Sequence, residues 1–234
     1  EELSSAFKGI KKLLKKDGVL VAEFIDLKSM MQNVAFDQIY HEHMFYFSAL
    51  NISALMKKFD FELLDFTHSP VHGGSGVFIC GKQGKHLPNK SVQEAFDKEM
   101  SAFEQQKIFH GFKSKIETNK RKAMQLIQDE IKLGRILGAY GAPAKAFTVF
   151  SYYELDDSSI SFCIDTTPTK IGKVFPSFNI PIFSEDALNS LEYNTLLINA
   201  WNYKEDILKK ASLIFKKGTK LIFLIPDLEI HIVK

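Results

Sequence analysis

Several features that mark specialised classes of protein are scarce or missing in these 234 residues. Basic and acidic residues nearly balance, 30 against 28 with a formal net charge of +2, so the basic excess of a dedicated nucleic-acid binder is missing. No apolar run approaches the ~20 residues that a membrane-spanning helix needs. No stretch reads as a signal peptide. We therefore expect a cytoplasmic protein with neither a nucleic acid nor a membrane as its partner.

Cysteine and arginine are also scarce. The two cysteines, Cys80 and Cys163, lie far apart in apolar runs, which favours buried reduced thiols over a disulfide or a metal pair. Arg121 and Arg135 are the only arginines in the sequence. A bound phosphate would therefore be held by lysine or by backbone N–H groups rather than by a bidentate guanidinium.

The start of the chain has the pattern of one helix–strand unit. Residues 1–16 predict an amphipathic helix, and residues 19–25 (VLVAEFI) predict a strand that is buried on both faces. The first residue is Glu rather than Met, and no strand precedes the first helix. We therefore expect residues upstream to be missing from this sequence.

The rest of the chain predicts two α/β parts joined by helices. Ser48 is placed to cap a helix that runs to Phe59, with strands after it at 61–68 and 76–81. Residues 91–133 contain no proline and one glycine, and they predict two helices or one long helix interrupted near Gly111.

From Gly134 onward, strands alternate with helices again, as in a small parallel sheet covered by helices. The predicted strands are 135–140, 160–164, 195–200 and 220–225. The predicted fold class is α/β, with a partial Rossmann-like sheet, a helical linker and a second small Rossmann-like domain with a parallel sheet. The predicted boundaries are 1–89, 90–133 and 134–234.

The densest group of polar side chains is Tyr40-His41-Glu42-His43, which stands between apolar residues. In an extended segment Tyr40 and Glu42 would share one side, whereas a tight turn would let all four converge. Tyr, Glu and His in one pocket can move a proton at neutral pH. Two alternatives stay open: a buried polar network that locks the loop, and a zinc or iron site with an incomplete ligand set.

Two glycine-containing turns are candidate ligand sites. In His72-Gly73-Gly74-Ser75 the glycines let the backbone approach a ligand closely, although a plain β-hairpin turn is the favoured interpretation. The stretch GAYGAPAK, which ends at Lys145, follows a strand and opens a helix, so its N–H groups and the lysine predict an anion site. Close packing of helix on strand is the alternative, because the third glycine of the dinucleotide fingerprint is missing.

Other polar residues follow the predicted strands. Asp165 ends one strand, and Trp201 and Asn202 follow another. Ligands of open α/β sheets bind at the carboxyl ends of the strands, so these residues should lie beside the glycine turn. Packing in the core or at its rim is the alternative for Trp201.

Together these motifs resemble the C-terminal part of the nucleotide-sugar C-methyltransferases, enzymes of deoxysugar pathways. The resemblance covers essentially the whole chain, and FDQIYHEH (36–43) is its most specific signal. The other matching stretches are Tyr46-Phe47-Ser48, HGGS (72–75), GAYGAPAK (138–145), Asp165–Pro168 with Lys170 and Gly172, Ile180-Pro181-Ile182 and AWNYK (200–204).

The resemblance implies an enzyme that uses S-adenosylmethionine (SAM). In this family a zinc-binding subdomain and a SAM-binding Rossmann domain come first. Most of the SAM site, and any zinc, would then lie outside these residues, with 19–25 as the fifth strand of the methyltransferase sheet. The C-terminal Rossmann-like domain would help to hold a nucleotide-sugar substrate.

The resemblance also implies residue roles. His43 would remove a proton next to a sugar ketone, Glu42 would orient His43, and Tyr40 would support the oxyanion of the enolate that takes the methyl group. No metal ligand is assigned in this chain. The implied substrate-binding residues are His72, Gly73, Ser75, Tyr140, Gly141, Ala142, Lys145, Asp165, Trp201 and Asn202.

Two other functions compete with the enzyme. In the first, the chain is a non-catalytic module that lacks the cofactor half and binds a nucleotide sugar or serves assembly. In the second, it is a degenerate homologue kept for packing. Binding of a nucleotide or a keto sugar without turnover would separate these two possibilities.

Overall fold

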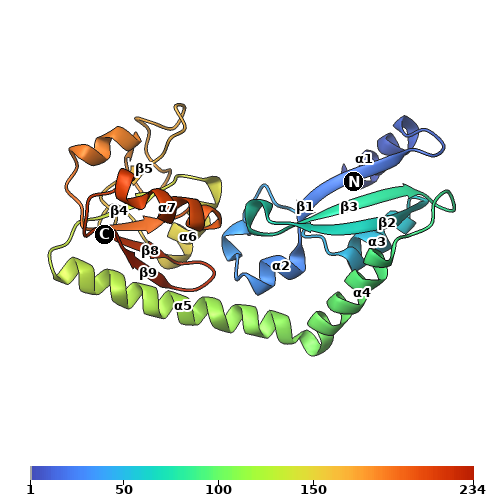
Figure 1. The fold of residues 1–234 in the computed structure, drawn as a ribbon, viewed down its shortest axis with the longest axis horizontal. Coiled ribbons are helices and arrows are strands. Elements are labelled where there is room, and N and C mark those ends of the chain that lie inside the picture. The colour runs from blue at the N-terminus through green and yellow to red at the C-terminus, as the bar shows by residue number, and fades with distance from the viewer. Residues whose placement is uncertain (1) are drawn as a thin grey trace. The chain divides into compact units, whose positions relative to one another are not determined.

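The computed structural model describes residues 2–234, except for the side chains of Glu2, His72 and Gln105. It confirms the α/β class, with two compact units that each contain a sheet and helices (Figure 1). The first unit holds the residues up to Asn33 and Met44–Phe112, and the second holds Val34–His43 and Lys113–Lys234. This division differs from the three predicted segments, because 34–43 belongs to the second unit and the bridging helices are shared between the units.

The first unit is built on a three-stranded sheet of order β1-β3-β2, in which β3 is antiparallel to both neighbours. The capping role predicted for Ser48 is confirmed, because its side chain accepts a hydrogen bond from the Asn51 N–H. The elements are α1 (Glu2–Leu13), β1 (Val19–Ile25), α2 (Leu27–Gln32), α3 (Ala49–Lys57), β2 (Phe61–Ser69), the 3-10 turn η2 (Val71–Gly73), β3 (Ser75–Lys82) and α4 (Lys90–Phe103).

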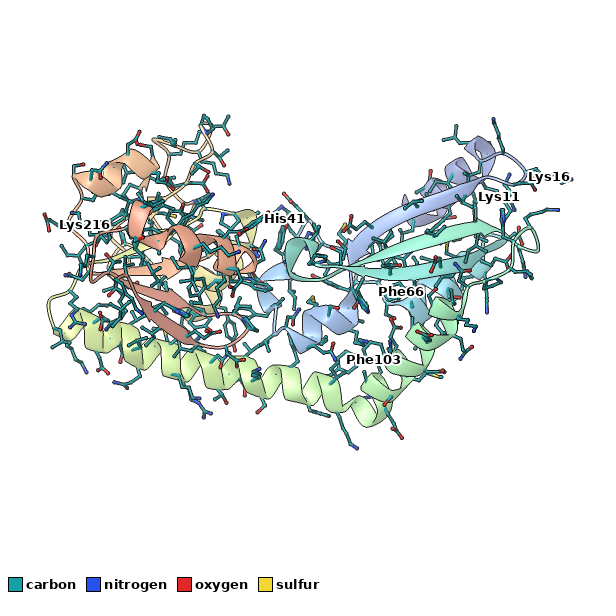
Figure 2. All side chains as sticks on the ribbon, viewed as in Figure 1. Lys11, Lys16, His41, Phe66, Phe103 and Lys216 are labelled. Carbon is teal, nitrogen blue, oxygen red and sulfur yellow. The ribbon has the colours of Figure 1, made fainter. Side chains whose placement is uncertain are left out.

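The core of the first unit lies on one face of this sheet. Phe66, labelled in Figure 2, packs against Phe78 with ring centroids 5.1 Å apart. On β1 only alternate residues face this core, since Val19 and Val21 are 44% and 59% exposed. The prediction that this strand is buried on both faces is therefore wrong. An apolar run does not reveal that a strand has helices on one face only.

The predicted helical linker is two helices, but its interruption is not at Gly111. Helix α4 is followed by the 3-10 turn η3 (Glu104–Gln106) and by α5 (Lys107–Lys132). The break coincides with Gln106, whose φ of 58° is left-handed. Gly111 lies inside α5. A glycine is tolerated inside a long helix, so it does not by itself mark a break.

The second unit is a six-stranded sheet of order β6-β5-β4-β7-β8-β9, parallel except for β9. The strands are β4 (Leu137–Tyr140), β5 (Cys163–Ile164), β6 (Ile182–Phe183), β7 (Thr195–Ile198), β8 (Lys220–Phe223) and β9 (Glu229–Ile232). The helices that follow Lys113 are the remainder of α5, α6 (Ala144–Tyr153) and α7 (Lys204–Ile214), with 3-10 turns η1 (Phe36–Gln38), η4 (Glu185–Asn189) and η5 (Trp201–Tyr203).

This strand order is that of a doubly wound sheet. The chain builds β4, β5 and β6 outward in one direction and then returns to add β7 and β8 on the other side of β4. The topological switch point lies between β4 and β7, where two loops leave the sheet in opposite directions. Both faces are covered, since neighbouring residues such as Leu196 and Leu197 are both fully buried. None of the helices in the described part of the chain is long and apolar enough to cross a membrane.

Candidate functional site

Residues 40–43 form a tight turn in the second unit, closed by the hydrogen bond from the His43 N–H to the Tyr40 carbonyl (2.9 Å). The first and fourth side chains meet, with the rings of Tyr40 and His43 4.3 Å apart between centroids. The two side chains at the corners of the turn are exposed: His41, labelled in Figure 2, by 89% and Glu42 by 63%. The turn therefore brings together two of the four polar side chains.

The hydrogen-bond partners of His43 determine the tautomer of its neutral ring. Its Nδ1 lies 2.8 Å from the carbonyl oxygen of Gln38, which can only accept, so Nδ1 carries the hydrogen. Its Nε2 is then bare and accepts from the Tyr40 hydroxyl at 3.2 Å. A neutral imidazole with a bare Nε2 in a half-buried position has the form that a general base requires.

Tyr40 is held as a neutral phenol. Burial raises the pKa of its hydroxyl, and the nearby carboxylates of Glu42 and Asp37 raise it further. A phenol that keeps its proton can donate to an oxyanion as charge develops. Glu42 thus acts on Tyr40 through its charge. Glu42 was expected to orient His43, and in the structure the two ring nitrogens of His43 contact the Gln38 carbonyl and the Tyr40 hydroxyl.

Asp37 is a buried carboxylate that was not among the predicted site residues. Its Oδ2 accepts from the Trp201 indole N–H at 2.7 Å and lies 3.3 Å from the Lys145 ammonium. Its Oδ1 has no hydrogen-bond partner among the described residues. Burial raises the pKa of this carboxyl, and Lys145 and Trp201 offset the rise only in part. In the sequence, Asp37 is the acidic residue that directly follows Phe36 in the FDQIYHEH stretch.

Lys145 and Asn202, predicted to hold the substrate, are brought together beside this carboxylate. The Lys145 ammonium donates to the Asn202 side-chain oxygen at 3.0 Å and lies 4.6 Å from the centre of the Trp201 ring. Burial lowers the pKa of Lys145, and Asp37 offsets part of that shift. The positive charge predicted for a ligand anion is therefore already paired inside the protein.

The glycine turn after β4 is also paired within the chain. Gly141 has a left-handed φ of 90°, and its N–H donates to the Ile164 carbonyl at 2.7 Å. The Ala142 N–H donates to Asp165 Oδ2 at 2.7 Å. In the first turn of α6 the Ala146 N–H donates to the Pro143 carbonyl at 2.9 Å, whereas helix geometry leaves the N–H groups of Ala144 and Lys145 without an intrahelical acceptor.

Asp165 carries a full charge at the end of β5. Burial opposes this, but the hydrogen bonds from Thr167 and Ala142 and the charge of Lys170 lower the pKa of its carboxyl. Lys170 also donates to the Ala142 carbonyl at 2.8 Å. Asp165 is thus brought beside the glycine turn as predicted, where it occupies an N–H group that a ligand anion would use.

The Tyr140 hydroxyl reaches the start of η4, which follows β6. This hydroxyl donates to Glu185 Oε2 at 2.6 Å, and the Tyr140 ring packs edge-on against Phe215. Burial raises the pKa of this hydroxyl, and Glu185 raises it further. Tyr140 therefore stays protonated beside a carboxylate.

In the first unit, HGGS forms the connection of the β2–β3 hairpin, which confirms the turn interpretation. The Gly73 carbonyl accepts from Asn33 at 2.8 Å, and the Ser75 hydroxyl donates to the Val71 carbonyl. A Cβ at Gly74 would lie 2.8 Å from the Cβ of Ser29, so that position requires glycine. The His72 side chain, a predicted ligand contact, lies outside the described part of the structure.

Neither a metal nor a cofactor finds a complete site in the described residues. Among the side chains that the structure describes, which leave out Glu2 and His72, no group of three His, Cys, Asp or Glu is arranged to hold a metal ion. The strand–glycine–helix turn of residues 138–145 has its Ala142 N–H and its Lys145 ammonium paired with the chain's own carboxylates. Neither group is free to bind the carboxylate of SAM, so the described residues do not fit SAM, and we derive no step through it.

The fold and this site define a Rossmann-like α/β domain with a tyrosine–histidine pair carried beside its switch point. Residues 70–226 match the family model described as "C-methyltransferase C-terminal domain". The chain belongs to this family, which confirms the resemblance to the C-terminal part of a C-methyltransferase. It is 28% identical over 228 residues to "C-methyltransferase NovU" of Streptomyces niveus. That match covers 97% of this chain and 54% of the relative, so the chain spans about half the relative's length.

Proposed function

We propose that this chain supplies the proton-abstracting part of a SAM-dependent C-methyltransferase whose substrate is a nucleotide-linked keto sugar. Family membership supports the reaction class, and the relative's printed name gives the same class. The observation that carries the proposal is the contact of His43 Nδ1 with the Gln38 carbonyl, which can only accept and so places the hydrogen on Nδ1 and leaves Nε2 as the basic atom.

The chemistry follows from the two paired side chains. A C–H bond beside the ketone breaks, its proton goes to His43 Nε2, and its electrons move into the enolate oxygen. The Tyr40 hydroxyl, which now donates to Nε2, turns to donate to that oxygen. Glu42 helps to keep the phenol protonated. The enolate carbon formed in this way is nucleophilic, and the proposal for this chain ends at that carbon.

The substrate's nucleotide and sugar are proposed to lie at the carboxyl ends of β4 and β7. Gly141, Ala142, Lys145, Trp201 and Asn202 line this end of the sheet in the second unit. Because the Ala142 N–H and the Lys145 ammonium are internally paired, the backbone N–H groups of Ala144 and Lys145 at the start of α6 are the proposed phosphate donors. Tyr140 and Asp165 are proposed to hold the residues at this end of the sheet in place. Gly73, Ser75 and His72, in the first unit, remain proposed substrate contacts.

Hydrogen–deuterium exchange tests the proton-transfer step without any cofactor. The protein is incubated in D2O with a TDP-4-keto-6-deoxy sugar, and deuterium uptake next to the ketone is followed by mass spectrometry above the protein-free rate. We expect catalysed exchange in the wild type and a loss of about 100-fold or more in His43→Asn, the scale of a general base. His41→Asn, in the exposed neighbour, is the matched control and should exchange normally.

Two results would contradict the proposal in different ways. Equal exchange by the wild type and His43→Asn would remove His43 as the base. Binding of TDP in calorimetry with no catalysed exchange in any variant would favour the non-catalytic binding module.

A further inference from the structure

The crevice at the switch point of the second unit contains a segment of the chain itself. Ligands of open α/β sheets bind at this place, outside the carboxyl ends of the strands. Here the Asp37 carboxylate lies between the Trp201 indole N–H, which follows β7, and the Lys145 ammonium, which begins α6. The Asp37 carboxylate is therefore the partner of the Lys145 ammonium and the Trp201 indole N–H at this end of the sheet.

Keeping Asp37 buried in this position is costly. Its side chain is 1% exposed, that of Lys145 is 13% exposed, and Asp37 Oδ1 has no partner among the described residues. Apolar residues of similar volume often stabilise a fold as well as a buried ion pair does, so packing alone does not account for this pair. In some proteins a buried polar or ionic group fixes the register of the segments that it joins.

The segment that Asp37 fixes is the short helical turn η1. Phe36, at its start, packs against the rings of Tyr152 and Tyr153 at 5.2 and 6.0 Å between centroids. Asp37 anchors the middle of the turn. Gln38, at its end, presents the carbonyl that accepts from His43 Nδ1. The orientation of that one carbonyl thus depends on how η1 is held.

We propose that Asp37 is a positioning residue for His43. Its contacts with Lys145 and Trp201 fix η1, η1 aims the Gln38 carbonyl, and the carbonyl keeps the hydrogen of His43 on Nδ1. The consequence for catalysis rests on the proposed function, whereas the effect on the tautomer does not.

Nitrogen NMR of the histidine rings tests the proposal directly. In the full chain with 15N-labelled histidine, at a pH where the rings are neutral, the ring shifts and couplings report which nitrogen carries the hydrogen. The signals of His43 are assigned by their loss in His43→Asn. We expect the Nδ1–H form in the wild type, and at least a tenfold fall in the ratio of Nδ1–H to Nε2–H in Asp37→Ala. Asp37→Asn keeps an acceptor for Trp201 and should retain most of the wild-type ratio.

A matched control separates positioning from general destabilisation. Glu130→Gln breaks another buried charge cluster of the same unit, at Lys220 and Thr195, and should leave the His43 signals unchanged. If Asp37→Ala does not fold, Trp201→Phe removes the indole N–H donor while keeping an aromatic ring at this position, and it should shift the ratio in the same direction. A wild-type tautomer ratio in a folded Asp37→Ala or Trp201→Phe would overturn the proposal.

Exchange kinetics give a second readout that depends on the proposed function. Asp37→Ala should lower kcat for deuterium exchange by about tenfold with little change in KM, because it disturbs the base rather than substrate binding. If the wild type shows no exchange, the proposed function fails while the tautomer result still decides the role of Asp37. A changed KM with an unchanged kcat would count against positioning.

Discussion

At the scale of single residues, a four-residue turn allows an aromatic hydroxyl to reach an imidazole nitrogen. Tyr40 and His43 occupy its first and last positions, which a tight turn brings close together. The sequence predicted that these side chains stand near each other. It could not predict which group orients His43, because the partner is a backbone carbonyl and every residue has one.

Tyr40→Phe removes the hydroxyl that donates to His43 Nε2 and keeps the ring. Under the proposed function, it should lower the rate of deuterium exchange by about 100-fold, the scale seen when one oxyanion donor is removed. Tyr203→Phe, at an exposed tyrosine of the same unit, is the control and should retain the wild-type rate. An unchanged exchange rate in Tyr40→Phe would show that the Tyr40 hydroxyl is not the donor to the oxyanion.

Asp37 shows why a residue pattern was not enough to find the whole site. Its partner Trp201 lies 164 residues further along the chain. Nothing local to FDQIYHEH identifies the indole or the ammonium that it meets. Periodicity describes neighbours along one element. Contacts between residues so far apart in the sequence depend on how β4 and β7 meet in the sheet.

At the scale of elements, the sequence predicted four strands of the second sheet and missed β6 and β9. Strand β6 is two residues long, too short for an alternating pattern to show. Strand β9 runs antiparallel to β8 and follows it without a helix in between, so it does not fit the alternation of strands and helices in the rest of the unit. The sequence did predict that Asp165, Trp201 and Asn202 follow strands beside the glycine turn. That prediction does not depend on the edge strands β6 and β9.

Helix α5 is attached to this sheet by a buried carboxylate. Glu130 accepts from Thr195 of β7 at 2.7 Å, from Arg135 at 2.8 Å and from Lys220 of β8. Burial works against the charge, but these hydrogen bonds outweigh it and lower the pKa of Glu130 to about 2. The charged form is thus favoured by the folded state.

Glu130→Gln should lower the free energy of unfolding by roughly 3 kcal/mol near neutral pH. Because the folded-state pKa lies below the unfolded value, this stability is fully present above about pH 4.5 and disappears as the pH falls towards 2. The difference between wild type and variant in urea titrations should therefore narrow over that range. Glu117→Gln, in an exposed pair on the same helix, should change stability by less than about 1 kcal/mol. A difference that did not change with pH would contradict this account of Glu130.

At the scale of the whole molecule, each of the two units has its own hydrophobic core. A unit with its own core can unfold as a unit, so a single two-state transition is not expected for the chain. The family model spans residues 70–226 and so includes parts of both units.

Scanning calorimetry should show two transitions that respond to different variants. Gly138→Ala would place a Cβ 2.5 Å from the buried Phe162 ring, and this overpacking should cost the second unit about 1–3 kcal/mol. Phe78→Ala opens a cavity in the first unit and should cost about 3–5 kcal/mol there. Each variant should shift one transition only, and a single transition shifted by both would show that the units unfold together.

The sequence of the second unit is not continuous, because residues 34–43 belong to it while their neighbours on either side belong to the first. This has a consequence for recombination between relatives. A chimera joined anywhere from residue 44 to residue 112 pairs one parent's Asp37 and His43 with the other parent's Lys145 and Trp201. Exchanges that transfer 34–43 together with everything after Lys113 keep the buried contacts of one parent intact, so domain grafts in this family should be designed with two junctions around that segment.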